Sequence, residues 1–190
     1  MTAQILAWPL RQRPARIAWS ERAVFAVSVL ILLVFAQPWS AFMPAQQVSD
    51  VGSSIARIMF FPTYALGLGL VSLRPGAAMR GLAGQPFLVL LLCVAAASTA
   101  WSVAPGETSR RVVAIVLTTF CGVALGSRWR WQALAEVFAA AFAILSIVSL
   151  VLAVAVPGVG RMGQPFPGAW RGVWMEKNAL GGMMAFGCLI

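Results

Sequence analysis

The sequence contains no histidine, one lysine, one tyrosine and five acidic residues among its 190 positions. Histidine is the commonest general base in enzymes and a frequent zinc ligand, so its absence argues against both roles. The three cysteines, Cys93, Cys121 and Cys188, all lie within apolar segments. This placement favours thiols packed among helices over disulfides. We therefore predict no metal site and no cofactor.

Charge of either sign is scarce, whereas hydrophobic residues dominate the composition. Only 10% of the residues are charged and 61% are hydrophobic, against roughly 25% and 45–50% in a soluble domain. A chain of this length leaves too much surface exposed to hide so many apolar side chains from water. The composition predicts an all-α protein, a polytopic transmembrane helical bundle.

The net charge of +9 raises the question of nucleic-acid binding. The arginines, however, occur in small groups between apolar runs and do not form one patch. Such a distribution is typical of charges that set the topology of a membrane protein. We therefore expect membrane lipid, and no nucleic acid, among the partners.

A helix needs about 20 largely apolar residues to cross a bilayer. Five runs predict complete spans, at 23–42, 54–73, 86–101, 111–127 and 133–156. A sixth run, 179–190, has only twelve residues, so we expect a truncated sixth span and a chain that is the amino-terminal portion of a longer protein. Residues 1–22 form a basic amino-terminal segment, and residues 23–190 form the transmembrane domain.

Basic loops remain on the cytoplasmic side of a membrane, so the arginines predict the orientation. A cytoplasmic amino terminus places eight basic residues inside, namely Arg11, Arg13, Arg16, Arg22, Arg74, Arg80, Arg128 and Arg130. The outer side then receives five, namely Arg110, Arg111, Arg161, Arg171 and Lys177. This orientation leaves two outer segments that are basic and need a separate explanation.

The first of these segments is "STAWSVAPGETSRR", residues 98–111. We expect Trp101 at the membrane interface, Pro105 as a helix breaker, and Thr108 or Ser109 as the N-cap of the next helix. Arg110 and Arg111 either contact lipid headgroups or belong to a binding site. The following helix contains "GVALG", a G-x-x-x-G pair that predicts close packing against another helix of the chain.

The second outer segment, residues 158–182, concentrates charge before the last apolar run. It carries Arg161, Arg171, Glu176, Lys177 and Asn178. Asn178 is suited to cap the next helix, and backbone N–H groups at a helix start attract anions. Arg171 and Lys177 add direct phosphate contacts, because arginine offers a bidentate fork. The alternative is an interfacial loop whose charges touch only lipid.

Both outer segments resemble motifs of a known superfamily. "STAWSVAPGETSRR" resembles the S-x-x-W-S-x-x-P-x-x-S/T-x-x-R signature of the O-antigen ligase and O-antigen polymerase superfamily. "WRGVWMEKNALGG" resembles the R-G-x-x-x-H-K-N-x-x-G element that follows it, especially in the exopolysaccharide-polymerase-like branch. The resemblance covers roughly residues 85 to 190.

The resemblance implies a bacterial inner-membrane protein that transfers glycans from undecaprenyl pyrophosphate to a glycan acceptor. The reaction is a metal-independent glycosyl transfer at the outer face, with pyrophosphate as the leaving group. Arg171 matches the arginine that superfamily members place near the pyrophosphate, with Lys177 and Asn178 beside it. Arg110, Arg111 and Arg161 are secondary candidates for the same site.

Two departures from the superfamily pattern qualify what the resemblance implies. Glu176 replaces the usual histidine, which puts that histidine's role in doubt and adds a negative charge near Arg171 and Lys177. Members also have a large outer loop between later helices, which this sequence does not include, so we expect these 190 residues to be inactive alone. The alternative function is a membrane transporter or a non-catalytic component of polysaccharide export.

Overall fold

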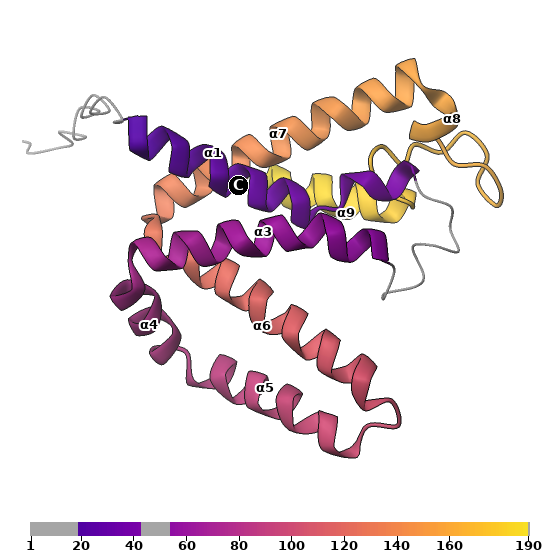
Figure 1. Ribbon diagram of the computed structural model, residues 1–190. Coiled ribbons are helices and arrows are strands. Elements are labelled where there is room, and N and C mark those ends of the chain that lie inside the picture. Colours follow the sequence, from indigo (N-terminus) through magenta and orange to yellow (C-terminus); the bar gives the residue numbers. More distant parts are fainter. Residues whose placement is uncertain (1–18, 43–53, 190) are drawn as a thin grey trace, which may run out of the picture.

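The computed structural model describes residues 19–42 and 54–189, and these residues fold into helices joined by short connections without a β-strand (Figure 1). The predicted all-α fold is therefore confirmed for this part of the chain. Most of the predicted amino-terminal segment, residues 1–18, lies outside the described residues.

Ten helical elements follow one another along the described chain. They are α1 (Trp19–Phe35), the 3-10 helix η1 (Pro38–Phe42), α3 (Ser54–Leu73), α4 (Pro75–Ala83), α5 (Pro86–Ala97), η2 (Ser98–Trp101), α6 (Pro105–Arg128), α7 (Trp131–Ala155), α8 (Pro157–Gly160) and α9 (Lys177–Cys188). The long helices run in alternating directions, so that their connections gather at two opposite ends (Figure 1). One end holds η1 and α8 and the other holds α4 and the α6–α7 connection, whereas η2 lies at the tip of the α5–α6 hairpin, away from α8 (Figure 1).

The core lies around α1, which packs against α7 on one side and against α3 and α6 on another. Val29 belongs to a buried cluster with Val137 and Ala141 of α7. Ile31 belongs to a second cluster with Cys121 and Leu125 of α6. The apolar residues of α1 therefore contact two different helices, as expected for a helix that is hydrophobic on most of its surface.

Two predicted helix boundaries were wrong. The run 23–42 does not form one helix, because the chain leaves α1 at Ala36 and Gln37 adopts a left-handed conformation with φ of 53° before η1 begins. α6 begins at Pro105, earlier than the expected caps. Proline suits the first turn because its missing N–H would have no partner there.

The basic segment after α3 contains a helix that the pattern of apolar runs does not predict. α4 follows α3 at a bend of 99° and packs against α6. Arg74 stands at the bend and Pro75 starts the new helix. A proline cannot continue a preceding helix without a steric clash, which accounts for the change of direction at this point.

Two helices, α6 and α7, are long and apolar enough to cross a membrane, and the bent α3–α4 pair would make a third. α5 and α9 have only 12 residues each, and the described part of α1 has 17. Five complete spans are therefore not confirmed. α5 has no buried residue, and its Phe87 side chain is 85% exposed. Apolar helix faces without protein cover are typical of contact with lipid.

Candidate functional site

The α7–α9 connection, residues 156–176, carries Arg161 and Arg171 of the predicted site and leads directly to Lys177 and Asn178 at the start of α9. Its two limbs run antiparallel, with Arg161 and Trp170 forming an isolated β-bridge. The Met162 N–H donates to the Ala169 carbonyl at 2.7 Å, and the Arg171 N–H donates to the Gly160 carbonyl at 2.9 Å. These backbone hydrogen bonds place Arg161 and Arg171 next to each other on the two antiparallel limbs, although ten positions separate them in the sequence.

Two glycines allow this connection to lie against α7. Gly172 has φ of +61°, and a Cβ added there would stand 2.6 Å from both Cβ and Oγ of Ser149. A Cβ on Gly160 would overlap the backbone at Leu152 and Ala153. Glycine at position 172 of the R-G element is therefore required by both the backbone conformation and the close approach to α7.

Arg171 connects three segments through backbone carbonyls. Its Nε donates to the Val159 carbonyl at 2.7 Å, and its Nη2 is 3.4 Å from the Ala41 carbonyl. A guanidinium has five N–H donors, so these contacts leave part of the fork available. The side chain is half-buried. The guanidinium is consequently held in one orientation while retaining free donors.

The Arg161 guanidinium donates to a carbonyl that Arg171 does not contact. Its Nε donates to the Ala153 carbonyl at 2.8 Å, in the last turn of α7. Carbonyls in the last turn of a helix have no partner within the helix, and a cation there also interacts favourably with the helix dipole. The structure thus brings the backbones of Arg161 and Arg171 together but directs their guanidinium groups to separate carbonyls.

Lys177, Asn178 and Glu176 lie at the start of α9. The Lys177 Nζ is 3.5 Å from the centre of the Phe166 ring, a cation–π contact that joins α9 to the tip of the connection. The expected cap is wrong, since Glu176 occupies the N-cap position and Asn178 lies inside the first turn. Asn178 is exposed.

Glu176 forms no ion pair with the basic side chains of the described residues. The ion pair closest to the predicted site residues joins Arg110 to Glu107, at 3.1 Å. Glu176 is exposed, and its carboxylate forms no cap hydrogen bond. Glu176 therefore adds a negative charge beside Lys177 without a direct ion pair to the described basic side chains.

Arg110 and Arg111 lie in the first turns of α6, at the tip of the α5–α6 hairpin. Figure 1 shows this tip projecting away from α8 and the α7–α9 connection. Arg110 is exposed and paired with Glu107, and Arg111 is exposed. The hydroxyl of Thr108, one of the two expected N-cap residues, is 2.6 Å from the Ser102 hydroxyl. The Ser102 Oγ also accepts from the Ala104 N–H at 3.1 Å. Arg110 and Arg111 thus lie apart from Arg161, Arg171 and Lys177, which together are called the Arg171 group below.

Buried polar groups beneath the connection escaped the sequence reading. The Ser149 Oγ accepts from the Val173 N–H, and the Ser40 Oγ donates to the Val173 carbonyl, both at 3.4 Å. Trp174 is 5% exposed, and its Nε1 lacks a partner among the described residues. Serines are common in apolar helices, so no feature of the sequence separates these two from the others.

Comparisons of the chain with protein-family models, with curated proteins and with solved structures found no match.

Proposed function

We propose that this chain forms part of a bacterial inner-membrane glycosyl-transfer protein of the O-antigen ligase or polymerase type. The substrate is a glycan linked to undecaprenyl pyrophosphate, and the outer face of the membrane supplies the glycan acceptor. The observation that carries the proposal is the half-buried Arg171 guanidinium, fixed by the Val159 and Ala41 carbonyls with donors to spare.

A fixed arginine suits a reaction that releases pyrophosphate. Negative charge builds on the leaving oxygen as the glycosidic bond to phosphate breaks, and oriented donors stabilise that charge without reorganising. The remaining N–H groups of Arg171 form a bidentate contact with phosphate oxygens. Lys177, held over Phe166, adds a second positive charge from the start of α9.

The proposal includes a transmembrane arrangement with a cytoplasmic amino terminus. The six apolar runs then form the spans, five complete and a sixth starting at α9. Alternating helix directions support this arrangement, since η1, α8 and the start of α9 lie at one end, whereas Arg74, Arg80, Arg128 and Arg130 lie at the other (Figure 1). The Arg171 group then faces outward, where lipid-linked glycans are joined.

The direct test is Arg171→Ala in the complete protein, produced in cells that assemble the lipid-linked glycan. We expect loss of at least 90% of polymerised or ligated surface glycan, because removing one transition-state donor costs about 10²–10³ in rate. Arg74→Ala is the matched control, since Arg74 is exposed at the opposite end. Equal membrane levels of both variants must be verified by immunoblot.

Binding provides a second readout. The Kd of the purified protein for undecaprenyl pyrophosphate should rise about tenfold or more in Arg171→Ala, the amount expected for a lost charge-assisted contact. The Kd of Arg74→Ala should equal that of the wild type. Normal surface glycan together with unchanged binding in Arg171→Ala would contradict the pyrophosphate assignment.

A transporter is the second candidate, and the 99° bend between α3 and α4 is the observation that favours it. Broken helices commonly line transport sites near the middle of the membrane. The bend here lies beside Arg74, at the end of α3. Glycan flux across vesicles without any glycan joining would favour the transporter over the glycosyl-transfer protein.

A further inference from the structure

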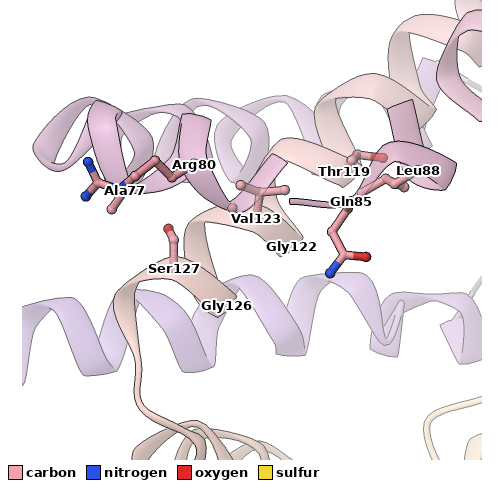
Figure 2. A pocket seen from close by; sticks show the side chains of 10 residues that line it. Ala77, Arg80, Gln85, Leu88, Thr119, Gly122, Val123, Gly126 and Ser127 are labelled. Atoms are coloured by element: carbon pink, nitrogen blue, oxygen red, sulfur yellow. The ribbon is translucent and has the colours of Figure 1, made fainter. Parts of the chain in front are cut away.

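A groove lies between α4, α5 and α6, at the end of the molecule opposite Arg171 (Figure 2). Its volume is about 600 Å³, and it opens to the surface of the molecule. The lining residues are Ala77, Arg80, Gly81, Gln85, Leu88, Thr119, Gly122, Val123, Gly126 and Ser127. One cationic residue, three uncharged polar residues and several small or apolar residues thus share one cavity, and none of them is acidic.

The floor of the groove is the G-x-x-x-G pair of α6. The sequence predicts that this pair packs against a helix, but a Cβ on Gly122 or Gly126 meets no atom within 4 Å. The close glycine contact of α6 lies elsewhere, where Gly67 of α3 meets Cys121. Gly122 and Gly126 therefore border open space, and side chains added at these positions would project into the groove.

The polar groups lie where a lipid headgroup and ester region would bind. The Arg80 side chain is exposed on α4 and has no hydrogen bond or ion pair to the described residues, and the Gln85 side-chain amide likewise has no partner there. The Ser127 Oγ donates to the Ala124 carbonyl at 3.3 Å, which leaves its lone pairs for an acceptor role. Figure 2 shows Arg80 beside Ala77 on one wall and the Ser127 hydroxyl pointing across the groove.

The remaining length of the groove is apolar. Leu88, Val123 and the two glycines form it, and Thr119 to Ser127 of α6 extends about 12 Å along the helix axis at 1.5 Å per residue. The Thr119 hydroxyl donates to the Ile115 carbonyl at 2.9 Å, so it presents no free donor at the far end. Neighbouring α5 side chains are exposed and apolar, including Leu91 at 62%.

We propose that this groove binds an anionic phospholipid, with the phosphate on Arg80, the ester region beside Gln85 and one acyl chain over Gly122 and Gly126. Charge complementarity selects the headgroup, because Arg80 lines the groove and Arg128 and Arg130 lie at the same end. Basic pockets between membrane helices bind anionic headgroups on the cytoplasmic side. The inference rests on the membrane orientation of the proposed function but not on its substrate or reaction, since the groove and the Arg171 group lie at opposite ends.

Native mass spectrometry of the 190-residue chain in detergent micelles tests the site. The probes are phosphatidylglycerol and phosphatidylcholine with identical acyl chains. We expect wild-type protein to retain phosphatidylglycerol at least fivefold more than phosphatidylcholine, with one tightly bound molecule per chain. Arg80→Gln and Gly126→Leu should each reduce phosphatidylglycerol retention about tenfold, the first through the lost charge-assisted contact and the second by filling the acyl path.

Two matched controls make the test specific. Arg74→Gln removes the same charge at the same end without altering the groove lining, and Gly69→Leu adds the same side chain at a glycine of α3 with open space around it. Both should retain phosphatidylglycerol like the wild type. Equal retention of the two lipids, unchanged retention in Arg80→Gln and Gly126→Leu, or equal loss in the controls would overturn the proposal. Circular dichroism of every variant must show wild-type helicity.

Discussion

Gly172 lies against Ser149 so closely that an added Cβ would stand 2.6 Å from the serine Oγ. The contact joins the R-G element to the middle of α7, and the neighbouring Val173 N–H uses the same serine oxygen as its acceptor. The position of Arg171 therefore depends on the absence of a side chain at the next residue.

Gly172→Ala should destabilise the protein by about 2–5 kcal/mol, because a positive φ costs about 1–2 kcal/mol for an L-residue and overpacking adds about 1–3 kcal/mol. The free energy of unfolding in mixed detergent micelles measures the effect. Gly163→Ala is the control, since its Cβ meets no atom within 4 Å. Equal stability of the two variants would contradict the close contact.

At Trp174, one substitution should have little effect on the free energy of unfolding. Its ring is buried with Val173, Leu145 and Ala36, but its Nε1 donor has no partner among the described residues. Trp174→Phe keeps most of the apolar contact and removes the unsatisfied donor, so the free energy of unfolding should change by less than about 1 kcal/mol. Trp174→Ala should cost about 3–5 kcal/mol. A large loss in Trp174→Phe would reveal a hydrogen bond to the indole.

Gly67 of α3 lies directly against Cys121 of α6. A Cβ on Gly67 would overlap the Cys121 Sγ, so Gly67→Ala should destabilise the protein by about 1–3 kcal/mol. Cys121→Ala removes the sulfur and should rescue much of this loss in the double variant. A double-mutant cycle measures the coupling, and additive effects would contradict direct contact.

The proposed orientation predicts which loops a membrane-impermeant maleimide reaches. In a variant without native cysteines, Gly163→Cys should be labelled in intact spheroplasts, because position 163 lies in the exposed α7–α9 connection. Arg130→Cys, at the α6–α7 connection, should be labelled only after permeabilisation. The reverse pattern would place the Arg171 group on the cytoplasmic side and exclude an outward-facing substrate.

Hydropathy alone located the long helices, because apolar runs in this chain are separated by charge and proline. The predicted run 54–73 coincides with α3, and 133–156 differs from α7 by only a residue or two at each end. The errors occur where local backbone geometry decides. A left-handed Gln37 ends the first helix early, and Pro105 starts α6 before the hydroxyl residues that suggested a cap.

The candidate site was predictable only in its charged side chains. Arg161, Arg171 and Lys177 stand out in an apolar sequence, whereas their partners are backbone carbonyls and an aromatic ring. Ala41 lies 130 residues before Arg171, and no residue type announces that its carbonyl will accept a hydrogen bond. The groove under α4 was missed because glycine pairs ordinarily indicate helix contacts.

The contacts of Arg171 with Val159 and Ala41 also determine how freely the surrounding sequence can drift. Every amino acid carries the same peptide oxygen, so residues 41 and 159 can be exchanged without removing the acceptors. Only the arginine and the glycine after it have chemistry that no other residue reproduces at those places. Related sequences can therefore preserve the arrangement while sharing little more than the Arg-Gly pair at these two positions.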